Sequence, residues 1–197
     1  MRDTFRILTV CTGNICRSPL AQMLLARDLA DVEGVVVDSA GTHAQPGAAM
    51  SEPSQEIARS LGIDSPEQHQ AQRLTEDLLS TADLILAMDR GHKRLIVELN
   101  PRVTKRVFTL REFARLAQAT TEQDLALEVT ASEGPARLKQ TVTAVGLSRG
   151  LVAPPESPEE LDVIDPFRQE QAVYERSTQE ILPAVTSTVK ILMEALP

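Results

Sequence analysis

The sequence predicts a three-layer α/β fold, in which a doubly wound parallel sheet lies between layers of helices. Short apolar runs typical of buried strands alternate with amphipathic helical patterns through the first half of the chain. The chain has 197 residues, 42% of them hydrophobic, and is long enough to bury a core. We expect one domain over residues 1–197, with four parallel strands at residues 5–10, 35–37, 84–87 and 107–108.

The first predicted strand is followed by a short loop and then by a helical pattern over residues 19–29. Apolar residues recur there at Leu20, Met23 and Leu24, which is the spacing of one helix face. A strand that leads directly into a helix is the beginning of a parallel α/β unit.

A second helix is predicted over residues 52–61, where apolar residues again share one face. Ser51 stands where an N-cap is expected, and Pro53 occupies one of the first helical positions. Gly62 stands where a helix would end. These signals fix both ends of the predicted helix.

The alternation of strand-like runs with helical segments is no longer clear over residues 118–160. This stretch holds turn-rich segments, a helical pattern at residues 136–147 and a proline-rich connector at residues 153–158. We interpret it as an insertion that either packs on the sheet or is partly mobile. Residues 171–196 carry apolar residues at helical spacing and predict a long closing helix.

The formal net charge of −8, without a basic stripe, argues against nucleic acid as a partner. No apolar stretch is long enough to cross a bilayer, and the first residues lack a signal-peptide core. We therefore expect a cytoplasmic protein without membrane insertion. Its two cysteines lie five positions apart, which is neither a disulfide framework nor a zinc-binding pattern.

The run Val10–Pro19 joins the first predicted strand to the first predicted helix, and it contains Cys11 and Arg17. A helix N-terminus is a favourable place for a phosphate, because its backbone N–H groups point outward. In a Cys-x5-Arg loop these N–H groups and the guanidinium surround a tetrahedral oxyanion while the thiol faces its central atom. The positive surroundings favour the nucleophilic thiolate.

Displacement of the oxygen of a phosphate ester requires a proton donor for the leaving group. Asp165 is the best placed of 28 acidic residues, since Pro166 fixes the backbone beside it. The ends of parallel strands that carry such loops form the ligand-binding edge of an α/β sheet. We expect Cys11 and Asp165 to meet there.

Four segments together resemble the low-molecular-weight protein tyrosine phosphatases. Cys11–Pro19 resembles the signature loop of that family, and Asp165–Phe167 resembles its general-acid motif. Asp38–Thr42 and Leu84–Asp89 are similar to two further blocks in the family's order. The resemblance covers about two-thirds of the chain and leaves residues 118–160 outside.

The resemblance implies a metal-independent phosphomonoester hydrolase, of the protein-tyrosine-phosphatase type, that needs no cofactor. Cys11 would form a cysteinyl-phosphate, Arg17 would hold the equatorial oxygens, and Asp165 would protonate the leaving alcohol and then activate water. Ser18 would keep the Cys11 sulfur a thiolate, and Asn14 would hold the loop's shape together with Ser39. The phosphate-binding loop would comprise Thr12, Gly13, Asn14, Ile15, Cys16 and Ser18.

Other residues take secondary roles. Cys16 matches a second cysteine that many members carry, and is either a redox partner of Cys11 or a core thiol. His43 either lines the groove or is an exposed loop histidine, and His69 is expected to make a structural hydrogen bond. Asp89 and His92 are expected to pack against or cap the helix after the third strand.

Aromatic residues make up only 3% of the chain. Family members often place aromatics beside the phosphotyrosine ring, but residues 42–47 have none and Phe167 alone follows the Asp-Pro pair. The expected partner is a phosphotyrosyl protein or another small phosphate ester. Two alternatives stay open: an arsenate reductase that uses a small external thiol, and a catalytically weak phosphate-binding module.

Overall fold

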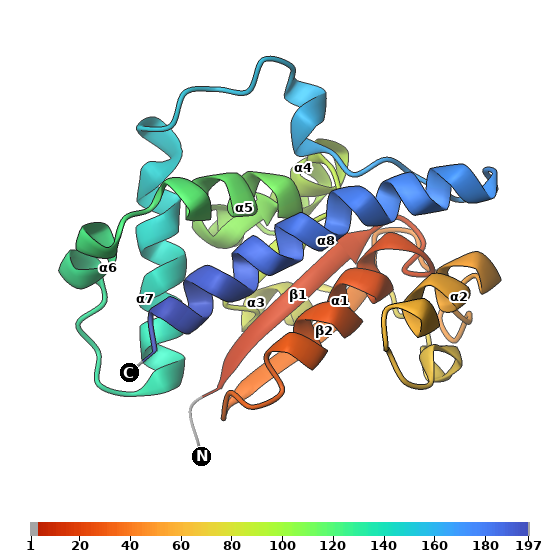
Figure 1. Cartoon of the computed structure of the whole chain (residues 1–197), viewed down its shortest axis with the longest axis horizontal. Coiled ribbons are helices and arrows are strands. Elements are labelled where there is room, and N and C mark those ends of the chain that lie inside the picture. Colours follow the sequence, from red (N-terminus) through yellow and green to blue (C-terminus); the bar gives the residue numbers. More distant parts are fainter. Residues whose placement is uncertain (1–3, 197) are drawn as a thin grey trace.

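The computed structural model describes residues 4–196, and these form a four-stranded parallel sheet in the order β2-β1-β3-β4 (Figure 1). The strands are β1 (Phe5–Cys11), β2 (Val35–Gly41), β3 (Leu84–Ala87) and β4 (Val107–Thr109). Each coincides with a predicted strand, and β2 runs four residues further than predicted. The sheet lies between two layers of helices, which confirms the predicted fold class.

Side chains of β1 alternate between the two faces of the sheet and enter two separate cores. Phe5 and Ile7 pack in the larger core, and Leu8 and Val10 pack in the smaller one. The larger core is covered by α1 (Arg17–Asp28), α5 (Leu110–Ala119), α7 (Gly134–Leu147) and α8 (Gln171–Glu194). The smaller is covered by α3 (Glu76–Thr81), α4 (Arg90–Leu99) and the 3₁₀ helix η2 (Pro101–Arg106).

The helix α8 runs diagonally across α1 and α5, and it is the long closing helix that the sequence predicts (Figure 1). Its buried residues include Tyr174, Ile181 and Leu192. The chain enters α8 directly from the segment that contains Asp165. Packing of α8 against α1 therefore brings the last part of the chain beside the first loop.

The helix α2 (Glu52–Ser60) lies beside α1 and α8, next to the short 3₁₀ helix η1 (Pro66–Gln68). Ser51 is the N-cap residue of α2, as predicted, but its side chain accepts no hydrogen bond from the helix backbone. Its hydroxyl instead donates to Ser54 Oγ and lies 3.2 Å from Cys16 Sγ. Gly62, just beyond the helix, has a positive φ of 77°, as a terminating glycine does.

Residues 120–161 leave the end of α5 and return to the sheet's carboxyl edge in an arch (Figure 1). They contain α6 (Glu122–Glu128), α7 and the 3₁₀ helices η3 (Ser148–Gly150) and η4 (Pro158–Leu161). The helix α7 confirms the one predicted at residues 136–147 and begins two residues earlier. Its buried face packs against α5 and β1.

The strand register places the ends of three strands side by side. Cys11 pairs with Gly41, and Val10 pairs with both Ala40 and Ala87. Because the strands are parallel, the loops that follow them emerge at one edge. The loop after Cys11 thus lies between the loops that follow β2 and β3.

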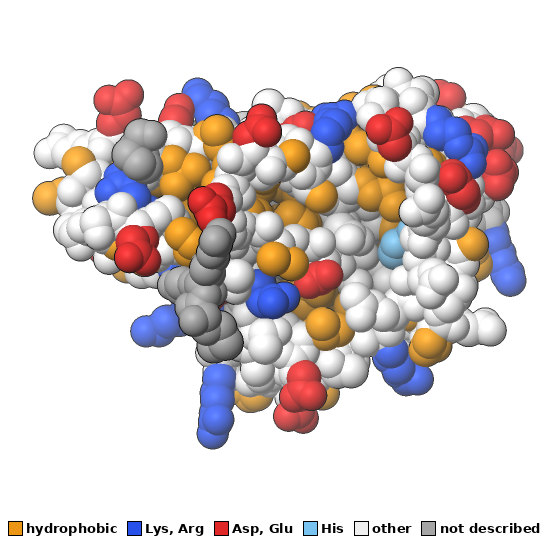
Figure 2. All heavy atoms as spheres, turned by 90° about the horizontal axis from the view of Figure 1, so that it is seen from below, with side chains coloured by type: hydrophobic (Ala, Val, Ile, Leu, Met, Phe, Trp, Pro, Cys, Tyr) orange, Lys and Arg blue, Asp and Glu red, His pale blue; other side chains and the backbone are white. Residues whose placement is uncertain are grey.

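The surface carries charges of both signs. On the face in Figure 2, Lys and Arg side chains are interspersed with Asp and Glu and do not gather into a stripe. Within residues 4–196, no helix combines the length and apolar character that a membrane span requires.

Candidate active site

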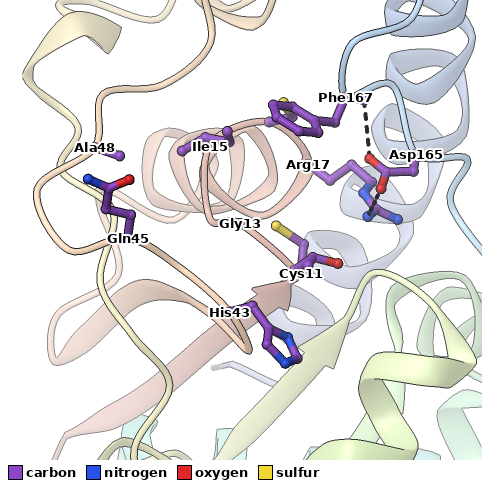
Figure 3. Close-up of a pocket in the computed structure, with 11 residues that line it drawn as sticks. Cys11, Gly13, Ile15, Arg17, His43, Gln45, Ala48, Asp165 and Phe167 are labelled. Carbon is purple, nitrogen blue, oxygen red and sulfur yellow. Dashed lines mark hydrogen bonds and ion pairs between the residues drawn. The ribbon is translucent and has the colours of Figure 1, made fainter.

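A cavity of about 280 Å³ opens at the carboxyl edge of the sheet (Figure 3). It is bordered by a phosphate loop, residues 11–18, and by an acid loop, residues 162–167. The loop after β2 forms the remaining side. The lining residues are Cys11, Thr12, Gly13, Ile15, Cys16, Arg17, His43, Gln45, Ala48, Asp165 and Phe167.

The phosphate loop turns sharply between β1 and α1. Cys11 is the last residue of β1, and Arg17 is the first of α1, so the helix N-terminus faces the loop. Asn14 makes the turn with a φ of 55°, a left-handed conformation that asparagine tolerates better than most residues. Its backbone N–H donates to Cys11 Sγ at 3.2 Å, and Ser18 Oγ lies 3.0 Å from the same sulfur. Donors at this sulfur stabilise its anionic form.

The fully buried Asn14 side chain ties the loop to two other segments. Its Nδ2 donates to Ser39 Oγ at 2.8 Å and to Ser18 Oγ at 2.9 Å. Its Oδ1 accepts from the backbone N–H of Gln72 at 2.9 Å. The pair of Asn14 and Ser39, which the resemblance implies, is thus in contact. Gln72 is a partner that the sequence analysis did not identify.

His69 supports the loop from the outside. Its Nε2 lies 2.7 Å from the backbone oxygen of Asn14, so the neutral ring must carry its proton on Nε2. Burial lowers the pKa of His69, and the bond to the carbonyl offsets part of that effect. The residue makes the structural hydrogen bond that the sequence analysis expects.

Gly41 lets β2 approach the phosphate loop closely. A Cβ atom at this position would lie 2.5 Å from the backbone oxygen of Thr12 and 2.9 Å from the backbone nitrogen of Asn14. Both distances are shorter than van der Waals contact. Only glycine allows the loop and the strand end to lie this close together.

Arg17 is the dedicated cation of the site and is 4% exposed. Its Nη1 donates to the backbone oxygen of Val163 at 3.0 Å and to Asp89 Oδ2 at 3.2 Å. Its Nη2 lies 3.0 Å from Asp165 Oδ2, and a dashed line in Figure 3 marks this ion pair. The guanidinium therefore connects the phosphate loop with the acid loop.

Asp89 contacts the terminal nitrogen of Arg17 that Asp165 does not contact. It caps α4, where Asp89 Oδ1 accepts from the His92 backbone N–H at 2.8 Å. His92 Nδ1 lies 2.9 Å from Asp89 Oδ2 without forming a linear hydrogen bond, and His92 Nε2 lies 2.8 Å from Thr12 Oγ1. Burial raises the pKa of Asp89, but the contacts with His92 outweigh it and hold this pKa at about 2. A charged carboxylate therefore always faces Arg17 at neutral pH.

The sequence analysis expects Asp89 and His92 only to pack against or cap the helix. Both also reach the phosphate loop, through Arg17 and Thr12 respectively. An acidic residue directly after a strand that ends at the ligand-binding edge is the signal that could have indicated this second role.

The acid loop is the more exposed wall of the cavity. The side chain of Asp165 is 53% exposed, and its Oδ1 accepts from the backbone N–H of Phe167 at 3.2 Å. Phe167 is the aromatic residue among those that line the cavity. The Arg168 guanidinium lies 5.0 Å from the centre of its ring.

Cys16 borders the cavity but is only 5% exposed. Burial raises its pKa, and hydrogen bonds from Ser51 and Ser54 offset part of the effect. Both Cys11 and Cys16 are free thiols. A high pKa keeps the Cys16 thiol protonated and makes it a weaker nucleophile than a thiolate.

The sequence model for low molecular weight phosphotyrosine protein phosphatases matches residues 6–145, well over half of the chain. The chain belongs to this family. It is accordingly a phosphatase of the low-molecular-weight type, an enzyme that hydrolyses phosphomonoesters. The match begins in β1 and ends in α7, and thus includes the phosphate loop.

Relatives of this phosphatase are named either as protein-tyrosine-phosphatases or as protein-arginine-phosphatases. A probable low molecular weight protein-tyrosine-phosphatase EpsP from Ralstonia nicotianae is 48% identical over 54% of the chain and 70% of its own length. A protein-arginine-phosphatase from Geobacillus stearothermophilus is 39% identical over 55% of the chain and 71% of its own length. The YwlE arginine phosphatase structure from the same organism superposes with a TM-score of 0.67, at 28% identity and over 96% and 93% of the two chains.

The cavity presents positive charge to an anion. Within residues 4–196, no group of three or more His, Cys, Asp or Glu side chains is arranged to hold a metal ion. The Arg17 guanidinium and the N-terminus of α1 both face the cavity. This arrangement can bind a phosphoryl group beside the sulfur of Cys11.

Proposed function

We propose that this hydrolase dephosphorylates phosphotyrosyl proteins through a cysteinyl-phosphate intermediate, with Asp165 as general acid and then general base. One observation carries the proposal: Cys11, Arg17 and Asp165 line the same cavity, and Arg17 contacts Asp165 at 3.0 Å. A nucleophile, an anion ligand and a proton donor in one cavity are the groups that phosphoryl transfer requires.

In the first step the Cys11 thiolate attacks phosphorus, the S–P bond forms and the P–O bond to the leaving phenol breaks. The proton that the phenolate oxygen needs comes from the Asp165 carboxyl group. Arg17 and the backbone N–H groups of the phosphate loop bind the equatorial oxygens, where charge accumulates in the transition state. The phosphoryl oxygens compete with Asp165 for the Arg17 guanidinium and so free the carboxyl group to carry a proton.

In the second step water attacks phosphorus and the S–P bond breaks. Asp165, now a carboxylate, accepts a proton from that water, and inorganic phosphate leaves with the Cys11 thiolate restored. The same carboxyl group acts as acid and then as base, as microscopic reversibility requires. No metal takes part, because Arg17 supplies the charge stabilisation.

The walls of the cavity favour an aryl leaving group. Ile15, Ala48 and Phe167 present apolar surface above the phosphate loop. Asp165 is the carboxylate among the lining residues, and it is paired with Arg17. A tyrosine ring packs well against such apolar walls.

Hydrolysis of 4-nitrophenyl phosphate in the presence of a chelator tests the mechanism. Cys11→Ser is expected to abolish turnover, because a serine hydroxyl without an adjacent base is a poor nucleophile. Cys16→Ser, a matched change on the same loop, is expected to retain measurable turnover. Chelator-sensitive activity, or activity that survives Cys11→Ser, would exclude the mechanism.

Kinetics on matched peptides test the substrate. We expect a higher kcat/KM for a phosphotyrosyl peptide than for the phosphoarginyl peptide of the same sequence. The opposite order would favour the activity that the name of the Geobacillus relative describes. Release of arsenite from arsenate with a small thiol, measured in parallel, tests the arsenate reductase alternative. Absence of turnover on every ester would favour a phosphate-binding module.

We place the enzyme in the cytoplasm. Both of its cysteines are free thiols, and a reducing compartment keeps the Cys11 nucleophile available.

A further inference from the structure

Each of the three residues before Asp165 is held by a hydrogen bond from another segment of the chain. The Asp162 carboxylate accepts from the backbone N–H of Arg90 at 2.8 Å and from Arg90 Nε at 3.0 Å. The Val163 backbone N–H donates to Met88 at 2.8 Å, and its oxygen accepts from Arg17. The acid loop is therefore fixed at its first two residues by groups at the sheet edge.

The third residue, Ile164, is held by a side chain that the catalytic scheme does not use. Its backbone N–H donates to Glu180 Oε2 at 2.8 Å. Glu180 lies on α8, and its side chain is only 16% exposed. A carboxylate that accepts a backbone N–H one residue before Asp165 restricts the backbone that carries the acid.

Arg111, on α5, completes this support. Its Nη1 donates to the backbone oxygen of Asp162 at 2.8 Å and lies 3.9 Å from Glu180 Oε2. Arg176 Nε lies 3.4 Å from the other oxygen of the same carboxylate. The Glu180 carboxylate thus lies between two cations, and its ion pair with Arg111 joins α8 to α5.

We propose that Glu180 and Arg111 are positioning residues that set the orientation of Asp165 toward the leaving group. The proposal rests on the general-acid role of Asp165. Neither residue lines the cavity, so they act through the backbone of residues 162–164 and not by contact with the substrate. A small displacement of a catalytic group costs a large part of its effect, and this makes such a support necessary.

Leaving-group dependence of kcat/KM tests the proposal, because this parameter covers the steps up to departure of the alcohol. Glu180→Met keeps the length of the side chain and removes the acceptor. It is expected to lower kcat/KM about tenfold for phenyl phosphate, whose leaving group needs a proton, and less than about twofold for 2,4-dinitrophenyl phosphate. Glu180→Gln, which retains an acceptor oxygen, is expected to restore most of the loss.

A control variant and a binding measurement separate positioning from damage to the fold. Glu175→Met changes an exposed acidic residue of the same helix and is expected to leave both rates unchanged. The inhibition constant of inorganic phosphate, a competitive inhibitor, reports whether the phosphate loop is intact. This constant should change less than about twofold in Glu180→Met. Equal losses on both esters, or a matching loss of phosphate affinity, would overturn the proposal.

A double-mutant cycle shows whether Glu180 acts through Asp165. In an Asp165→Asn background, Glu180→Met is expected to cost less than about twofold on phenyl phosphate, since there is no acid left to orient. Fully additive losses would overturn the positioning role. If Asp165→Asn itself slows both esters equally, the general-acid assignment fails instead, so the two failures are distinguishable. Arg111→Ala is expected to reproduce the leaving-group dependence with a smaller amplitude.

Discussion

The phosphate loop and the acid loop face each other across one cavity but are held by different kinds of interaction. The phosphate loop is fixed by buried hydrogen bonds, with Asn14 and Ser18 fully inaccessible to solvent. The acid loop is partly exposed and is held by charged side chains from four helices, among them Arg90 and Glu180. The phosphate loop is thus held mainly by buried, uncharged hydrogen bonds, and the acid loop mainly by charged groups from distant segments.

The largest effect is expected where the phosphate loop is packed most closely. Gly41→Ala places a Cβ atom within 2.5 Å of the Thr12 backbone oxygen and must displace the loop. We expect kcat/KM for 4-nitrophenyl phosphate to fall about a hundredfold or more, with a similar loss on all esters. Gly150→Ala is the control, because a Cβ there has no atom within 4 Å. A Gly41→Ala enzyme of normal activity would show that the loop is not sterically fixed.

A smaller effect is expected for the charged contacts of the acid loop. Asp162→Ala removes the carboxylate that binds Arg90, a pair with side chains 26% and 41% exposed. Because partly exposed ion pairs contribute little, kcat/KM for phenyl phosphate should fall only about fivefold. Hydrolysis of 2,4-dinitrophenyl phosphate should not change.

Glu159 provides the matched control for this change. Its carboxylate also pairs with Arg90, at 3.0 Å, but its side chain is 72% exposed and it does not belong to the acid loop. Glu159→Ala is expected to leave both rates unchanged. If Asp162→Ala slows both esters equally, the acid loop is coupled to the phosphate loop more tightly than the contacts indicate.

The smallest effect is expected from His69, which supports the phosphate loop from the outside. It concerns the pH dependence of the protein's stability. Burial lowers the pKa of His69 in the folded state, so the unfolded chain binds a proton more readily. The stability that neutral His69 contributes is therefore fully present above about pH 6.5, the ordinary pKa of histidine. This contribution is lost as pH falls toward the lower pKa of His69 in the folded state. His69→Gln can keep the bond to the Asn14 carbonyl without titrating.

Urea unfolding of both proteins at pH 7.5 and 5.5 checks this expectation. The urea midpoint of the wild type should fall more on acidification than that of His69→Gln. Equal shifts in the two proteins would mean that His69 does not contribute to the pH dependence.

The phosphate loop and the acid loop also differ in how far the sequence predicts them. The four strands and the phosphate loop follow from local patterns, since an apolar strand, a Cys-x5-Arg spacing and a helix are contiguous. Asp165 is one of 28 acidic residues, and it is recognised mainly by its resemblance to a family motif. Its distance from Cys11 depends on how α8 packs, which no local pattern specifies.

The contacts that the sequence analysis did not identify are long-range ones. Glu180 contacts Ile164, and Arg111 contacts Asp162. The sequence separation within each of these pairs belongs to no motif. Asp89 is recognisable as a helix cap, but its contact with Arg17 depends on the adjacency of β1 and β3. Ser51 carries the residue type of a cap, yet its hydroxyl finds other partners because α2 packs beside Cys16.

The arch over residues 120–161 offers a place where the protein can be extended by design. Residues 153–157, between η3 and η4, are exposed or half-exposed, and loops of this kind tolerate inserted domains. Contacts at residues 162–164 hold the downstream end whatever the length of the chain before it. A peptide-recognition domain inserted there would raise the local concentration of its target at the cavity, and so redirect the phosphatase without altering a catalytic residue.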